Sequence, residues 1–302
     1  MVDIHCHILP GVDDGSPSME DSLQMARMAA DSGVTDIIAT PHCNLPGDGP
    51  KNYRSASLRT GFSRLRQALE QEGIPLRIHP GAEVFCTPEL PELLDRRQLQ
   101  TLGGSRYLLV EFYFDESAEF MEQCFHQIRT RGLTPVAAHP ERYDAVQRDP
   151  YIIRRWFEGG VVIQLNKGSI LGRLGRRAQD TALWLLERGL AHAAASDAHS
   201  PDVRTPRMDL LKDLLRREYA PACPRLLLEE NPRRILEDRP LVGTDEPIFS
   251  QGRTSYESHP QNAARDPRAV YPDPAGLLRP ADLPPPHRGR DAPGDHLLHR
   301  FH

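Results

Sequence analysis

Short apolar runs alternate with longer helical patterns along this chain, and no other feature restricts its fold as strongly. The runs expected to form strands are, in chain order, VDIH (2–5), TDIIAT (35–40), LRIHPG (76–81), RYLLVEF (106–112), TPVAAHP (134–140), VVIQLN (161–166) and AHAAASD (191–197). The helices expected between and after them cover residues 19–32, 53–72, 89–96, 116–131, 150–160 and 176–188. Ser18 is a preferred N-cap residue, and Gly33, Gly73 and Gly132 stand where helices should stop. This alternation predicts an α/β fold with a parallel sheet and crossover helices.

Histidine and acidic residues follow nearly every predicted strand. They are His5, His7, Asp13, Asp14, His42, Glu83, Glu111, His139, Asp197 and His199. In a (β/α) barrel the carboxyl ends of all strands lie on one face, where side chains distant in sequence meet. This distribution favours a barrel, and an open doubly wound sheet is the alternative.

The spacing of these residues suits metal coordination. Side chains alternate along a strand, so His5 and His7 are expected to point to the same side. A carboxylate such as that of Glu111 has two oxygens and can bridge two ions. Imidazoles and carboxylates without paired thiolates suit zinc, manganese or iron. A single histidine at a strand end is more often structural, but its recurrence after successive strands favours a metal site.

Two arginines stand just beyond candidate ligands. Arg142 lies in the segment HPERY, and Arg204 follows SDAH. A planar guanidinium pairs with two phosphate oxygens and stays charged, so it suits phosphoester recognition. Each arginine alone could equally be a surface residue in a loop, and the neighbouring candidate ligands favour the functional interpretation.

Composition and charge narrow the class of protein. The chain has 302 residues, of which 39% are hydrophobic and 26% charged, as in ordinary globular proteins. Its net charge of −5 offers no overall basic field for nucleic acid. No apolar run approaches the roughly 20 residues that span a bilayer, and no secretory signal pattern is visible. Five scattered cysteines without a CxxC pair fit a reducing compartment, so we expect a cytoplasmic protein.

The composition divides the chain into two parts. Residues 1–247 are expected to form the globular domain. Residues 248–302 are rich in proline, arginine and histidine and lack apolar periodicity, so we expect a disordered tail. We interpret the tail histidines as solvated residues rather than metal ligands.

Seven motifs occur in a characteristic order: DIHCHILPGVDDG, ATPH, GAEV, EF, AHPERY, NKGSILG and SDAH followed by Arg204. Together they resemble the polymerase-and-histidinol-phosphatase (PHP) superfamily. More narrowly, they resemble its bacterial protein-tyrosine phosphatases of capsular and exopolysaccharide synthesis. The resemblance covers about residues 1–241. Cys43 and Lys167 depart from the family pattern, and we expect them to affect the rim of the site more than its metal core.

The resemblance implies a distorted, TIM-like (β/α)₇ barrel with three metal ions. Manganese is the expected metal, with iron, zinc and magnesium as alternatives. The implied ligands are His5, His7, Asp14, His42, Glu83, Glu111, His139, Asp197 and His199, with Asp13 as the alternative to Asp14. Arg142 and Arg204 would bind phosphate, and His199 is the candidate general acid.

The implied activity is hydrolysis of phosphotyrosine on a protein by metal-activated hydroxide. The expected substrate is the tail of a bacterial tyrosine kinase that controls capsule or exopolysaccharide synthesis. One alternative is a phosphatase of histidinol phosphate or another small phosphomonoester, and another is a non-catalytic regulator that binds the kinase. No nucleic-acid partner and no membrane-spanning segment are expected, and a homo-oligomer is left open.

Overall fold

Two parallel sheets of three and six strands lie at the centre of the computed structural model, which describes residues 1–242. The predicted tail from residue 248 and the last residues of the predicted domain lie outside this part. The smaller sheet has the order β1-β2-β4 and the larger β3-β5-β6-β7-β8-β9. The strands are β1 (Val2–Cys6), β2 (Asp36–Ala39), β3 (His42–Cys43), β4 (Arg77–Pro80), β5 (Glu83–Phe85), β6 (Tyr107–Glu111), β7 (Thr134–Ala138), β8 (Val162–Asn166) and β9 (Ala193–Ala195).

The two sheets meet at both edges. At one edge, β2 leads directly into β3, and β4 leads directly into β5. The pair β2–β4 of the smaller sheet therefore continues as the pair β3–β5 of the larger sheet. At the opposite edge, Cys6 at the end of β1 forms a parallel bridge with Ala198, just after β9. His7 N donates to Ala198 O at 2.8 Å, and Asp197 N donates to His5 O at 2.8 Å. The predicted parallel α/β architecture is confirmed.

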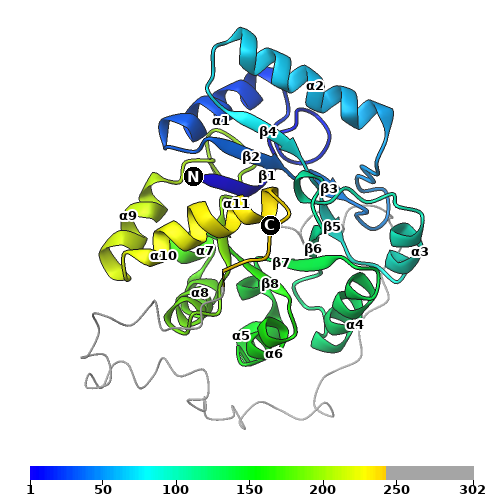
Figure 1. The fold of residues 1–302 in the computed structure, drawn as a ribbon, viewed down its shortest axis with the longest axis vertical. Coiled ribbons are helices and arrows are strands. Elements are labelled where there is room, and N and C mark those ends of the chain that lie inside the picture. The colour runs from blue at the N-terminus through cyan, green and yellow to red at the C-terminus, as the bar shows by residue number, and fades with distance from the viewer. Residues whose placement is uncertain (243–302) are drawn as a thin grey trace, which may run out of the picture. The chain divides into compact units, whose positions relative to one another are not determined.

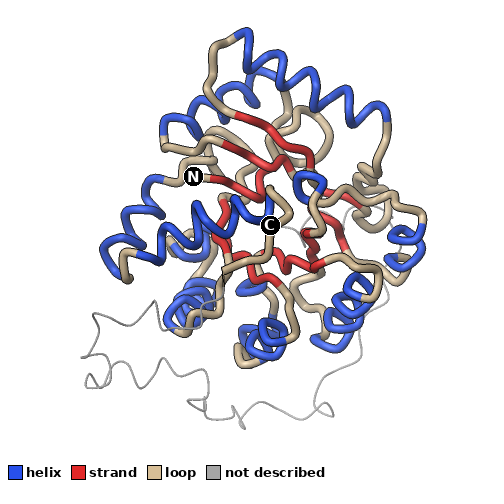
Figure 2. The backbone as a smooth tube through the Cα atoms, in the orientation of Figure 1, coloured by secondary structure: helices blue, strands red, loops and turns tan. Residues whose placement is uncertain are grey.

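Helices lie around the outside of the strands (Figures 1 and 2). The α-helices are α1 (Met19–Asp31), α2 (Ala56–Gln71), α3 (Leu90–Asp95), α4 (Ala118–Arg129), α5 (Asp144–Arg148), α6 (Ile152–Glu158), α7 (Lys167–Ile170), α8 (Arg176–Glu187), α9 (Asp209–Glu218), α10 (Ala222–Arg225) and α11 (Asn231–Leu236). Short helices of other types are η1 (Leu102–Gly104), η2 (Pro140–Arg142) and the π-helical η3 (Leu226–Glu230). None of the helices in residues 1–242 combines the length and the apolar character needed to cross a membrane.

Serine caps decide where three of the long helices begin. The hydroxyls of Ser18, Ser55 and Ser117 accept hydrogen bonds from the backbone N–H three residues later, at the starts of α1, α2 and α4. The cap at Ser18 is as predicted. The helices expected from residues 53 and 116 start slightly later, because a serine in extended backbone conformation satisfies the first free N–H groups.

A small apolar cluster supports the polar strand ends. On β6, Tyr107 and Leu109 belong to this cluster, and Glu111 follows with the same period of two. On β9, Ala193 and Ala195 belong to it, and Asp197 follows. The strands therefore carry apolar side chains in their first part and acidic side chains at the carboxyl end.

The side chain of His192 makes the stability of the fold depend on pH. Its Nδ1 accepts a hydrogen bond from Ile163 N at 3.0 Å, and its ring stacks on Phe157 with centroids 4.3 Å apart. Burial lowers the pKa of His192 to about 4. The pKa of this histidine in the unfolded chain is about 6.5. Between these two pH values the imidazole is therefore protonated in the unfolded chain but neutral in the folded chain.

We expect stability to fall as the pH drops through about 6.5 and to level off below about 4, with a loss on the order of 3 kcal/mol. His192→Asn keeps an acceptor for Ile163 but does not titrate. In urea unfolding at a series of pH values, the stability difference between wild type and variant should shrink as the pH falls. A difference that stays constant from pH 7 to pH 4 would contradict this account.

Candidate metal centre

Eight of the nine predicted ligands converge in three overlapping groups of donor atoms, each within 4.8 Å of one another. The groups are His5, His7, Glu83 and Asp197; His7, Asp14, His42 and His199; and His42, Glu83 and Glu111. The ninth, His139, lies beside them with its Nε2 3.0 Å from Glu83 Oε1. The cluster thus brings together residues at or just after the ends of β1, β6, β7 and β9 with His42 and Glu83, the first residues of β3 and β5, which continue β2 and β4.

Glu83 lies at the middle of the cluster and is only 1% exposed. Its Oε2 is 3.1 Å from His5 Nε2, 3.2 Å from His7 Nε2 and 3.2 Å from His42 Nδ1. Burial opposes ionisation of this carboxyl, but the imidazoles of His5 and His42 outweigh it and hold its pKa well below the usual range. One carboxylate oxygen therefore faces three potential metal-binding nitrogens.

Hydrogen bonds at Nδ1 orient three of the imidazole rings in the donor groups. His5 Nδ1 lies 2.9 Å from Gln164 Oε1, His7 Nδ1 lies 2.8 Å from Asp13 Oδ2, and His199 Nδ1 lies 3.1 Å from the carbonyl oxygen of Asp197. In each ring the Nδ1–H can donate to an oxygen, which leaves Nε2 as a lone-pair donor toward the cluster. This arrangement is typical of metal-binding histidines.

Several buried polar atoms of the cluster have the chemistry of metal ligands. Within residues 1–242, the buried atoms His139 Nδ1 and His199 Nε2 make no hydrogen bond, and His42 Nδ1 and Glu111 Oε1 lie 2.8 Å apart without good hydrogen-bond geometry. Buried polar atoms are normally hydrogen-bonded, and unpaired ones are costly. Metal ions would satisfy these lone pairs, so the donor set fits the predicted metal site.

The structure separates the roles of Asp13 and Asp14. Asp13 is fully engaged, because it accepts from Gly15 N at 3.0 Å and His42 N at 2.9 Å in addition to its contact with His7. Asp14 Oδ1 instead faces His42 Nε2 at 3.4 Å and His199 Nε2 at 3.6 Å. Asp14 is therefore the candidate ligand, and Asp13 holds the turn and the His7 ring.

Two site residues have a left-handed backbone. His139 has φ of 35° and Asp197 has φ of 49°. Non-glycine residues in this region cost about 1–3 kcal/mol and persist where surrounding contacts fix them. In both cases the sharp turn at the strand end directs the side chain toward the cluster.

Both predicted arginines meet at Asp197. Arg204 Nη2 is hydrogen-bonded to Asp197 Oδ2, and Arg142 Nη1 lies 3.8 Å from the same oxygen. The Arg142 guanidinium also lies 4.3 Å from the ring centroid of Phe114, a cation–π contact that fixes its plane. Two guanidinium groups thus stand at the edge of the donor cluster.

Several supporting residues were not predicted from the sequence. Gln164 and Asn166 belong to the buried strand β8, and Asn166 Nδ2 donates to Asp197 Oδ2. The side chain of Glu141 is buried and accepts from Asn166 N at 2.9 Å, and burial raises its pKa. Gln164 and Asn166 could have been found from the sequence, because they are polar residues two positions apart in an otherwise apolar strand.

The departures from the family pattern lie inside the protein. Cys43 is buried in the main apolar core. Lys167 is 4% exposed, and its Nζ donates to the carbonyl oxygens of Thr205 and, at 3.0 Å, Arg207. Neither residue belongs to the donor groups, and the expectation that they affect the rim more than the metal core stays a prediction. Lys167 anchors the loop that carries Arg204.

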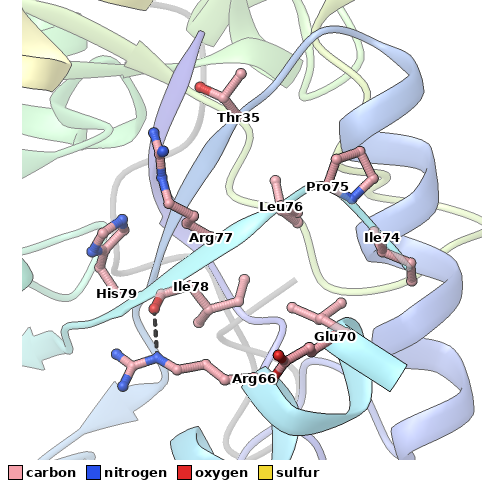
Figure 3. A pocket seen from close by; sticks show the side chains of 10 residues that line it. Thr35, Arg66, Glu70, Ile74, Pro75, Leu76, Arg77, Ile78 and His79 are labelled. Atoms are coloured by element: carbon pink, nitrogen blue, oxygen red, sulfur yellow. Dashed lines mark hydrogen bonds between the residues drawn. The ribbon is translucent and has the colours of Figure 1, made fainter. Parts of the chain in front are cut away.

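A separate hollow of 780 Å³ lies between α2 and β4 (Figure 3). Arg66, Arg77 and His79 line it, and each makes a polar contact within the protein. Arg66 donates to Ile78 O at 2.8 Å, while Arg77 and His79 bind the buried carboxylate of Asp36. This hollow shares no residue with the donor groups.

Comparison with known proteins identifies the family. The model of the family described as "Capsular polysaccharide synthesis, CpsB/CapC" matches residues 1–237. The chain belongs to this family.

Individual relatives agree with this assignment. Tyrosine-protein phosphatase YwqE of Bacillus subtilis (strain 168) is 36% identical over 241 residues, which cover 80% of this chain and 93% of the relative. Tyrosine-protein phosphatase CpsB of Streptococcus pneumoniae is 32% identical over 244 residues, 79% of this chain and 99% of the relative. Among solved structures, one described with YwqE and CpsB as metal-dependent tyrosine phosphatases superposes with a TM-score of 0.75. It is 36% identical and covers 82% of this chain and 98% of its own.

Metal analysis of two neighbouring variants tests the separation of Asp13 from Asp14. Asp14→Asn should lose about one bound ion per chain even at excess Mn²⁺, because one donor group loses its carboxylate. Asp13→Asn should weaken binding about 10–100-fold and regain full content at excess metal, because only the orientation of His7 suffers.

The measurement is mass spectrometry of metals after dialysis at limiting and excess Mn²⁺. Asp95→Asn on α3, where Asp95 pairs with Arg131 at the surface, serves as the control. Full metal content in Asp14→Asn together with a permanent loss in Asp13→Asn would reverse the assignment.

Proposed function

We propose that this chain is a metal-dependent phosphomonoesterase that hydrolyses phosphotyrosine on proteins. The observation that carries the proposal is the convergence of three donor groups with two arginines at Asp197. Its relatives named as tyrosine-protein phosphatases support the same activity.

The proposed metal ligands are the nine residues expected from the sequence: His5, His7, Asp14, His42, Glu83, Glu111, His139, Asp197 and His199. We propose three ions, one for each donor group, and manganese as the metal. When bound, such ions supply positive charge for phosphoryl oxygens and lower the pKa of water near neutrality.

The arginines position the phosphoryl group. Arg142 and Arg204 present planar guanidinium groups that can bind the non-bridging oxygens and stabilise charge in the transition state. In the free protein, Asp197 holds Arg204, which keeps the guanidinium near the donors. Substrate oxygens would then compete with Asp197 for the same N–H groups.

His199 suits metal binding better than proton donation. Burial, and then the neighbouring His7 and Arg204, hold the pKa of His199 well below its ordinary value. A neutral imidazole offers a lone pair but has no extra proton to give at neutral pH. A phenolate leaving group needs little protonation, so we propose that His199 is a ligand and not a general acid.

A cysteine nucleophile has little support. Burial raises the pKa of Cys6 well above its usual value and that of Cys43 to about 12. The thiolate is the reactive form, so buried thiols of this kind are poor nucleophiles. All five cysteines are free and buried, which supports the proposal of a reducing, cytoplasmic location.

Two finer proposals extend the function. The substrate protein is a bacterial tyrosine kinase of capsule or exopolysaccharide synthesis, in line with the family description. The two sheets form a distorted (β/α)₇ barrel, supported by the Cys6–Ala198 bridge and by strand continuity at the opposite edge.

Chelation provides the first test of the activity. Treatment with a chelator should abolish hydrolysis of a phosphotyrosine peptide, and added Mn²⁺ should restore it, because the proposed hydrolysis depends on ions held by the donor groups. Histidinol phosphate is assayed in parallel, and Cys43→Ser should keep most activity. Hydrolysis of histidinol phosphate alone would favour the small-molecule alternative, and metal-dependent hydrolysis of neither would refute the catalytic proposal.

A double-mutant cycle tests whether Lys167 acts through the Arg204 loop. Lys167→Met leaves the carbonyls of Thr205 and Arg207 without their donor, so kcat/KM for the phosphopeptide should fall about tenfold. In an Arg204→Ala background the same change should cost little more. Lys212→Met is the matched control, since Lys212 pairs with Glu229 elsewhere on the protein. Fully additive effects would show that Lys167 does not act through Arg204.

A further inference from the structure

A second cleft opens beside the candidate metal centre. It has a volume of 730 Å³ and lies beyond the carboxyl ends of β3, β5 and β6. We call the part of its lining formed by Pro46, Tyr53, Phe85, Pro88, Tyr113 and Phe120 the aromatic groove. Ligand sites in proteins have this range of volumes and this mixture of aromatic and polar walls.

The cleft that holds the aromatic groove is lined by residues that stand close in sequence to three candidate ligands. Three residues of the cleft, Asn44, Phe85 and Tyr113, each stand two positions after the candidate ligand on β3, β5 or β6. Phe85 lies on the same side of β5 as Glu83, since side chains alternate along a strand, while Asn44 and Tyr113 lie just past the ends of β3 and β6. The groove therefore begins two residues beyond the donors, where we expect the rest of a large phosphorylated substrate to lie.

Hydrogen bonds fix the inner wall of the groove in advance. Asn44 has a left-handed backbone with φ of 66°. Its side-chain amide donates to Phe85 O at 3.0 Å and to Thr87 Oγ1 at 3.1 Å, and its oxygen accepts from Tyr53 OH at 2.6 Å. The rings of Phe85 and Tyr113 meet edge to face with centroids 4.7 Å apart. A wall held in this way loses little entropy when a ligand binds.

The charges around the cleft do not select a strongly charged ligand. Glu92 and Arg96 form an ion pair at 3.3 Å, and the remaining charged residues of the lining are Lys51, Glu89 and Glu116. Both signs are present, so recognition must come mainly from the apolar surface. A small phosphate ester would leave this surface uncovered, whereas a polypeptide could cover it.

We propose that the aromatic groove binds the polypeptide segment that flanks the phosphotyrosine, and that a large apolar or aromatic side chain of this segment packs against Tyr53 and Tyr113. This inference rests on the proposed phosphotyrosine phosphatase activity and names its substrate class. The groove would then favour polypeptides over small phosphomonoesters.

Peptides with different flanks test the proposal on the Mn²⁺-loaded full chain. One set carries leucine or phenylalanine on either side of the phosphotyrosine, and the other carries glycine. We expect kcat/KM to be about tenfold higher for the apolar set, and Tyr113→Ala should remove most of this preference. Tyr151→Ala, which changes a surface tyrosine outside the groove, should keep it. Equal kcat/KM for both sets, or a preference unchanged in Tyr113→Ala, would overturn the inference.

A binding measurement separates this inference from the proposed activity. The same peptides with a non-hydrolysable phosphonate are titrated by fluorescence anisotropy into wild type, Tyr113→Ala and Tyr113→Leu, with folding checked by circular dichroism. Tighter binding of the apolar set to wild type, reduced in both variants, supports the groove even if no peptide is hydrolysed. Equal dissociation constants for the two sets refute it even if hydrolysis proceeds.

Discussion

The carboxylate of Glu83 is the constraint on which the site depends. It is buried, and one of its oxygens lies within 3.2 Å of nitrogens from His5, His7 and His42. Such a density of acceptors and lone pairs in a low-dielectric interior is costly unless cations or protons compensate it. Metal ions would resolve this conflict, since they can use the lone pairs of these side chains. The parallel strands contribute by bringing their carboxyl ends to one place.

The surrounding residues give this cluster its orientation. Gln164 and Asp13 fix two imidazole rings, while Asn166 and Arg204 hold Asp197. Lys167 extends the same support to the backbone that follows Arg204. Arg204, which we propose to bind phosphate, is thus connected by hydrogen bonds to side chains that suit metal binding. In our account, this connection lets one rigid end of the sheet both bind the phosphoryl group and promote its hydrolysis.

Seven of the nine strands and the convergence of the donors could be predicted from the sequence, because periodicity and strand-end position are local signals. The strands β3 and β5 were not predicted, because runs of 2 and 3 residues show no periodicity. The choice between Asp13 and Asp14 could not, since it depends on hydrogen bonds from His7 and His42 across the turn. The reach of Lys167 to the loop after Arg204 spans about 40 residues and has no local pattern. Helices α9 to α11 were also missed, because no strand or strong stop signal framed them. Closure of a barrel depends on a few backbone contacts, such as Cys6 with Ala198, that no side-chain pattern specifies.

Anomalous diffraction from crystals grown with Mn²⁺ tests the central claim most directly. Data collected above the manganese absorption edge locate the ions without any assumption about activity. The account predicts three peaks, one within bonding distance of each donor group, with two of them next to Glu83. Peaks that are absent from these groups, or that occur only at other histidines, would contradict it.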